Sequence, residues 1–255
     1  MLHVVPGAQP LTSPRTVLAA ATCALLTFLV LALIASREPP SALDHATRAL
    51  VLSTHSPQLA TPMVAVSTLG DRTGLIGLIA AGAVLTWRRW RRWAIALPLA
   101  MLGAGGLQLA AKWAVDRPRP SLAAWGFPSG HVLSLVVLLG LGVYLAWAAG
   151  AGRRARGLCC AAAALTLLAV GWSRLYLEAH WLSDLAGGLS LGLAYLLGII
   201  WVLERPCSPL GRDDRLAPWI SRFRRPRRPF GPSSAAGSGP ISPSIAAASL
   251  PPTTS

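Results

Sequence analysis

Two short stretches of the sequence carry basic and imidazole side chains at spacings that suit the binding of an oxyanion. The first reads KWAVDRPRPSLAAWGFPSGH, from Lys112 to His131, and the second reads SRLYLEAHWLSD, from Ser173 to Asp184. The residues in them that could do chemistry are Lys112, Arg119, His131, Arg174, His180 and Asp184. Ammonium and guanidinium groups form charge-assisted hydrogen bonds with phosphoryl oxygens. The two stretches together therefore predict a site for a phosphate-like group.

The cations Lys112, Arg119 and Arg174 indicate a binding site only if they lie close together. Lys112 is the only lysine in a chain whose Lys and Arg residues number 23. A lysine at the end of an apolar run often reaches the membrane interface, but this chain otherwise uses Arg for that purpose, which favours a need for a compact ammonium. Arg119 and Arg174 each offer a planar fork of donors, although lipid headgroups are the commoner partners of any single interfacial arginine.

The turn Pro128-Ser129-Gly130-His131 immediately precedes an apolar run. Ser129 suits the N-cap of a helix, and Gly130 permits a close approach of the backbone. The free amides of such a helix start point at whatever anion lies above them, and a histidine there adds a proton donor. The alternative is an ordinary turn and cap.

His180 and Asp184 are four residues apart and share a face if both lie on one helix. A carboxylate that bonds one imidazole nitrogen leaves the other as a nucleophile, although most such pairs are structural. Two histidines and an aspartate could also bind zinc, but the three nearby cations would repel a divalent ion. We therefore expect no metal and no other cofactor.

The complete set of spacings resembles the three-part signature of the type 2 phosphatidic acid phosphatase superfamily, over about residues 15–205. Lys112 and Arg119-Pro120 form the first part, the turn at 128–131 the second, and Ser173-Arg174 with His180 and Asp184 the third. The resemblance implies that His180 attacks phosphorus to form a phosphohistidine, with Asp184 orienting it. It implies that His131 protonates the leaving oxygen and then activates water. The residues implied to hold the phosphoryl oxygens are Lys112, Arg119, Ser129, Gly130 and Arg174.

The elements that must position these residues are apolar runs long enough to cross a bilayer. Only 13% of the residues are charged, which is typical of membrane proteins. The expected spans are residues 16–36, 73–87, 93–111, 132–149, 158–172 and 185–203. The first is longer than the apolar region of a cleaved signal peptide, so we expect a retained anchor. The second run, at 73–87, is short, so it must extend upstream if it crosses the bilayer. The mixed composition of residues 38–72 predicts two short amphipathic segments at the membrane interface. The predicted fold is an all-α, six-helix transmembrane bundle.

The distribution of basic residues predicts the orientation. With six spans, 16 of the 23 Lys and Arg residues fall on the side that holds both termini. The positive-inside rule then places a cytoplasmic N-terminal tail at 1–15, the transmembrane domain at 16–205, and a disordered, basic, Pro/Ser/Ala-rich cytoplasmic tail at 206–255. The loops with the candidate residues lie on the extracytoplasmic face of a plasma membrane. The net charge of +14 accompanies no nucleic-acid-binding motif, so no nucleic-acid partner is expected.

The predicted function is hydrolysis of a lipid phosphate or lipid pyrophosphate. Undecaprenyl pyrophosphate and other isoprenyl pyrophosphates, phosphatidate and phosphatidylglycerol phosphate are all eligible, with a preference for the isoprenyl lipids. The alternative is a phosphotransferase, in which an alcohol accepts the phosphoryl or headgroup moiety. A membrane scaffold or transporter without catalysis is a third possibility. Soluble vanadate-dependent haloperoxidases share the cradle of residues, but six apolar spans disfavour them. The sequence leaves the oligomeric state open.

Overall fold

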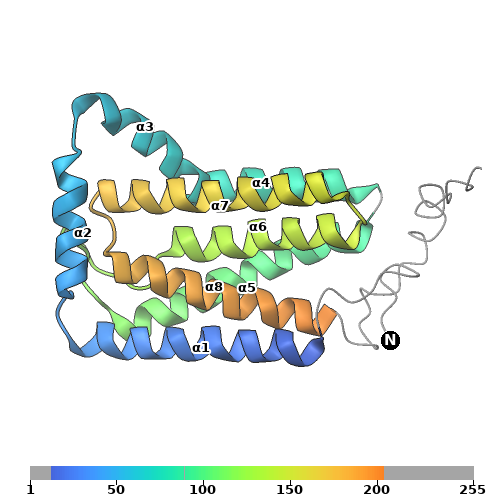
Figure 1. Cartoon of the computed structure of the whole chain (residues 1–255), viewed down its shortest axis with the longest axis horizontal. Helices are drawn as coiled ribbons and strands as arrows, with labels where there is room; N and C mark the ends of the chain where they lie inside the picture. Colours follow the sequence, from blue (N-terminus) through green and yellow to red (C-terminus); the bar gives the residue numbers. More distant parts are fainter. Residues whose placement is uncertain (1–12, 89, 204–255) are drawn as a thin grey trace, which may run out of the picture.

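The computed structural model describes residues 13–88 and 90–203, and within these ranges every regular element is a helix (Figure 1). The prediction of an all-α fold is confirmed. Residues 1–12 and the predicted tail at 206–255 lie outside the described residues. The elements are α1 Pro14–Arg37, α2 Ala42–Ser53, α3 Pro57–Ser67, η1 Thr68–Gly70, α4 Arg72–Trp87, α5 Arg91–Val115, α6 Gly130–Ala148, α7 Arg153–Tyr176 and α8 Leu182–Leu203.

Five of the described helices are individually long and apolar enough to cross a membrane: α1, α5, α6, α7 and α8. The segment α3–η1 and helix α4 meet the same test only as a pair, bent by 51° at their junction, which brings the number of candidate spans to as many as six. Leucines and valines on the outside of the bundle are exposed, as at Val84 (73%) and Leu85 (81%). Such side chains suit contact with lipid, so the chain is a multi-pass membrane protein.

The centre of the bundle is α6, which packs against α5, α7 and α8. Leu133, Val137 and Leu141 recur every four residues along one face of α6 and are almost fully buried. Half of the apolar window of α6 is buried, against 17% for α1 at the edge. The helix that carries His131 at its start is therefore the one most firmly held by packing.

The segment between the first two predicted spans departs in part from the expectation of two interfacial helices. Helix α2 lies across the end of the bundle, roughly perpendicular to the other helices (Figure 1). Ser41 and Asp44 fix its start through a capping box. Helix α3 is different, because it packs along α7 and runs through η1 into α4. It thus provides the upstream extension of the short second run.

The end of the bundle covered by α2 is also where the two chemical stretches meet. Helix α5 ends there shortly after Lys112, and α6 begins there at Gly130. Helix α7 ends there just after Arg174, and α8 begins there at Leu182. Because two of these helices end and two begin at the same end of the bundle, their packing brings together residues that are up to 72 positions apart in the sequence, from Lys112 to Asp184.

Candidate active site

A cavity of about 820 Å³ opens at this end of the bundle. Six of the eight residues selected from the sequence line it: Lys112, Arg119, Gly130, His131, Arg174 and His180. The other two, Ser129 and Asp184, are fully buried and do not line it. Apolar residues of α4 and α5 form another part of the cavity wall, so that a cationic head joins an apolar groove.

His180 lies in the turn before α8, and Asp184 lies in the first turn of that helix. The two residues therefore do not lie on one helix, and the shared helical face that their spacing allows is not formed. They meet because the Asp184 side chain turns back over the helix start, where its Oδ2 accepts a hydrogen bond of 2.8 Å from the backbone N–H of Trp181. His180 Nδ1 is 3.4 Å from the same oxygen, which is ion-pair distance without a formed hydrogen bond. His180 Nε2 is left for a ligand in the cavity.

The surroundings of His180 favour its neutral form. Burial lowers the pKa of this imidazole below its ordinary value of 6.5, because the charged form would lose its hydration. Asp184 opposes this shift, while the positive charges of Arg174 and Lys112 add to it. At neutral pH the imidazole therefore carries a lone pair, which is what a nucleophile needs.

Two of the three predicted cations are held by a hydrogen bond to a neighbouring loop or turn. The Lys112 ammonium donates a hydrogen bond to the carbonyl of Trp125 and is only 7% exposed. Arg174 Nη1 donates to Ser67 Oγ at 2.7 Å. Among the described residues, Nε of Arg119 and Nε of Arg174 are buried without a hydrogen-bond partner. Both arginines line the cavity, and guanidinium groups that are not fully paired within the chain suit an anion that is not part of it.

The start of α6 is more open than a conventional cap. Ser129 occupies the N-cap position as expected, but its side chain makes no capping bond and its Oγ is buried without a partner among the described residues. Its backbone N–H instead donates to the Asp184 carbonyl at 2.9 Å. A Cβ at Gly188 of α8 would lie 2.5 Å from the Ser129 carbonyl oxygen, so only glycine allows the turn to pack this closely.

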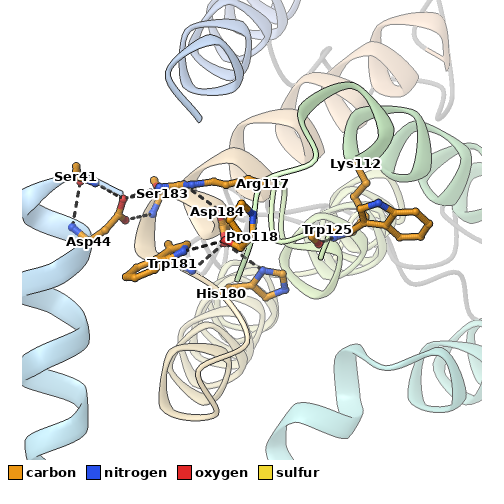
Figure 2. Close-up of polar contacts among 10 residues, drawn as sticks. All are labelled: Ser41, Asp44, Lys112, Arg117, Pro118, Trp125, His180, Trp181, Ser183 and Asp184. Atoms are coloured by element: carbon orange, nitrogen blue, oxygen red, sulfur yellow. Dashed lines mark hydrogen bonds and ion pairs between the residues drawn. The ribbon is translucent and has the colours of Figure 1, made fainter. Parts of the chain in front are cut away.

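Arg117 is not among the residues selected from the sequence, and the structure places it at the centre of a buried ionic network. Its guanidinium contacts Asp184 Oδ1 at 3.1 Å and Asp44 Oδ2 at 3.2 Å, and it donates to Ser183 Oγ at 2.6 Å (Figure 2). Arg117, Asp44 and Asp184 are at most 5% exposed. The network ties α2, the loop after α5 and the start of α8 to one carboxylate beside His180.

Asp44 is charged in this network. Burial alone would raise the pKa of its carboxyl. Hydrogen bonds from the Ser183 backbone and side chain, from the Ser41 backbone and from Arg117 outweigh burial and hold the pKa below its ordinary value of 3.8. The Asp44 carboxylate thus anchors both Arg117 and the Ser183 backbone N–H, which is 2.9 Å from Oδ1.

His131 has an acidic partner that the motif does not contain. Its Nε2 lies 2.6 Å from Oδ1 of Asp71, at the junction of η1 and α4. No short spacing in the sequence links these residues, because they are 60 positions apart. The only available signal was the position of Asp71 immediately before an apolar run.

The described residues contain no group of three or more His, Cys, Asp or Glu side chains placed to hold a metal ion. The donors that line the polar part of the cavity are mostly nitrogen atoms with hydrogens to give. This set suits an anionic ligand better than a cation.

Comparisons with known proteins agree with the motif and the fold. Comparison with curated protein sequences gives no significant match. Residues 93–206 match the sequence model of the PAP2 superfamily. The structure is similar to the crystal structure of a transmembrane PAP2-type phosphatidylglycerolphosphate phosphatase from Bacillus subtilis, with a TM-score of 0.65, 23% identity, and coverage of 71% of this chain and 94% of the other. The family model that matches is the one predicted from the motif, over the segment that carries it, and the chain has the fold of a transmembrane PAP2-type phosphatase.

Proposed function

We propose that this protein is a metal-independent membrane phosphatase that hydrolyses a lipid phosphate or lipid pyrophosphate through a phosphohistidine at His180. The observation that carries the proposal is the composition of one cavity, which holds two imidazoles and three cations at its head and an apolar groove behind them. The fixed cations Lys112, Arg119 and Arg174 supply the positive charge that phosphoryl transfer requires.

In the first step, Nε2 of the neutral His180 attacks phosphorus and the bond from phosphorus to the leaving oxygen breaks. His131 gives a proton to that oxygen, so that an alcohol or a phosphate departs. Asp184 faces the Nδ1–H of His180 and stabilises the positive charge that develops on the ring. The unused N–H groups of Arg119 and Arg174 and the start of α6 receive the phosphoryl oxygens.

In the second step, His131 takes a proton from water while the water oxygen attacks phosphorus. The phosphorus–nitrogen bond breaks, inorganic phosphate leaves, and His180 returns to its neutral form. The sum is the conversion of a lipid phosphate and water into a lipid alcohol and phosphate. Each histidine returns to its starting protonation state, so the two steps form a closed cycle.

The groove supports a lipid substrate. Leu75, Ile76 and Ile79 of α4 line one side, and Pro98, Met101, Leu102 and Leu109 of α5 line the other. Burial of an apolar chain there is favoured by about 0.8 kcal/mol per CH₂ group. The charge bias of the sequence supports a head of the cavity on the extracytoplasmic face of a plasma membrane, with both termini cytoplasmic.

The test is phosphate release by the full-length protein in detergent micelles with excess chelator. The panel contains an isoprenyl pyrophosphate, a phosphatidate and phosphatidylglycerol phosphate. We expect release from at least one lipid, a fall of about 10³-fold or more in His180→Ala, and retained activity in the control His55→Ala, because loss of a catalytic nucleophile is that costly. His55 is an exposed histidine outside the cavity.

Three results would contradict the proposal. Unchanged phosphate release by His180→Ala would exclude a phosphohistidine intermediate at this residue. Absence of phosphate release from every lipid in the panel would favour a non-catalytic role. If added alcohols captured most of the phosphoryl group in place of water, the protein would be a phosphotransferase with the same site.

A further inference from the structure

The turn at residues 67–71 touches the proposed site at three points, although it lies outside the motif and outside the segment 93–206 that matches the family. Ser67 Oγ accepts a hydrogen bond from Arg174, and Asp71 Oδ1 pairs with His131 Nε2. Gly70 packs against the His131 ring, and a Cβ at this position would lie 2.7 Å from His131 Cδ2. Any side chain at residue 70 would therefore displace the ring.

Asp71 is poorly explained as a structural residue. It occupies the N-cap position of α4, where aspartate normally accepts a hydrogen bond from a backbone N–H, but its side chain makes no such bond. Its carboxylate lines the cavity, where a negative charge opposes the binding of an anionic phosphate. Asp71 thus forgoes the cap and weakens substrate binding. Among the described residues, the one side chain with which its carboxylate forms a hydrogen bond is His131, and its charge also interacts with that of Arg174.

The charges around His131 show what this contact supplies. Arg174 and His180 also line the cavity that holds the imidazole, and positive charge on either opposes protonation of the ring. The Asp71 carboxylate acts in the opposite sense, through its contact of 2.6 Å with Nε2 and through its charge. His131 must be protonated to donate and must return to the same orientation to accept a proton from water, so a fixed carboxylate at one nitrogen serves both steps.

We propose that Asp71 is a positioning residue for His131, holding Nε2–H so that Nδ1 exchanges the proton with the leaving oxygen and then with water. This inference rests on the proposed function. As the bond from phosphorus to oxygen breaks, the proton moves from Nδ1 to the leaving oxygen. In the second step a proton of water moves to Nδ1, while Nε2–H stays bonded to the carboxylate. The site thus holds two His/Asp pairs, one for the nucleophile and one for the acid.

The experiment compares leaving groups that differ in their need for a proton. A short-chain phosphatidate expels an alkoxide, which needs general acid help, whereas p-nitrophenyl phosphate expels a stable phenolate. In Asp71→Asn we expect kcat for phosphatidate to fall about 100-fold with an unchanged or lower KM, since general acid–base catalysis contributes about 10²–10⁴-fold. The initial burst of nitrophenolate should stay within about threefold of wild type, because that step needs no acid.

The controls separate positioning from stability. Asp116→Asn removes an exposed carboxylate from the same end of the bundle and should leave both substrates unaffected. Asp71→Glu keeps the charge and should recover much of the phosphatidate activity. Thermal unfolding of each variant detects any loss of fold. Equal losses on both substrates in a folded Asp71→Asn, or no loss on either, would overturn the role of Asp71.

Failure of the proposed function has a different signature. In that case wild type releases no phosphate, or His180→Ala is as active as wild type. If wild type is active and His180→Ala is not, but Asp71→Asn shows no dependence on the leaving group, only the assignment of Asp71 fails.

Discussion

Replacing Arg117 with methionine removes a buried guanidinium but keeps a side chain of similar length. Arg117 contacts Asp44, Asp184 and Ser183. The guanidinium of Arg117 and the two carboxylates belong to residues that are at most 5% exposed. The substitution leaves two buried carboxylates without their shared cation. Each keeps part of its support, since Ser183 and Ser41 still bond Asp44 and the Trp181 N–H still bonds Asp184.

The expected magnitude follows from the cost of breaking a buried ion pair. Removing one partner costs about 3–5 kcal/mol of folding free energy. At about 2–4 °C per kcal/mol for a chain of this size, the unfolding temperature should fall by about 6–20 °C. Asp184 also loses the contact that fixes Oδ1, so kcat should fall about 10–100-fold, by analogy with the outer partners that orient metal ligands.

The assay is thermal unfolding followed by tryptophan fluorescence in detergent micelles, with phosphate release measured on the same samples. Arg117→Lys is the matched control, because it keeps the charge but cannot bridge both carboxylates and should be intermediate. Asp44→Asn and the double variant complete a cycle. We expect coupling of about 1 kcal/mol or more, because Asp44→Asn removes a stranded charge once Arg117 is gone. Additive effects within about 0.5 kcal/mol would refute the network.

Two further predictions concern the nucleophile and the groove. Because the pKa of His180 is lowered below its ordinary value of 6.5, the acid limb of kcat/KM should lie below pH 6.5. Asp184 raises this pKa, so Asp184→Asn should move the limb to still lower pH, and a limb above pH 6.5 would contradict the assigned environment. Gly105 lines the groove, and a Cβ added there would meet open space. Gly105→Leu should therefore raise KM about 10-fold for a long-chain lipid and leave KM for a short-chain analogue unchanged. Gly77→Leu is the control, because a Cβ at Gly77 also meets open space but Gly77 does not line the cavity, and equal effects of both variants would exclude the groove as the site of the lipid tail.

Most of the residues selected from the sequence line the cavity, because their side-chain types and spacing indicate phosphate chemistry before the fold is known. A lone lysine, paired histidines and fixed spacings mark Lys112, His131 and His180, and hydropathy marks most of the helices that carry them. The spacing of residues does not determine the local backbone geometry at two of the selected positions. His180 sits in a turn rather than on α8, and the Ser129 hydroxyl does not cap α6.

The supporting residues were beyond prediction for a different reason. Asp44 meets Ser183 across 139 positions, and Asp71 meets His131 across 60. Both come from the segment at 38–72, whose mixed composition indicated only interfacial helices. A contact of this kind depends on how α2 crosses the bundle and how η1 bends into α4. Neither property follows from periodicity or composition.

The position of α2 across the end of the bundle also determines how much of the chain an autonomous catalyst needs. The segment that matches the family model begins at residue 93. Two acidic residues before it contact residues inside it, because Asp44 pairs with Arg117 and Asp71 pairs with His131. A protein shortened to that segment would keep the complete signature and lose two of its acidic partners. Arg117 would then retain a single carboxylate, and the imidazole at the start of α6 would share the cavity with Arg174 without the carboxylate that now pairs with it. The proposed reaction thus depends on charges that the helices before the motif supply.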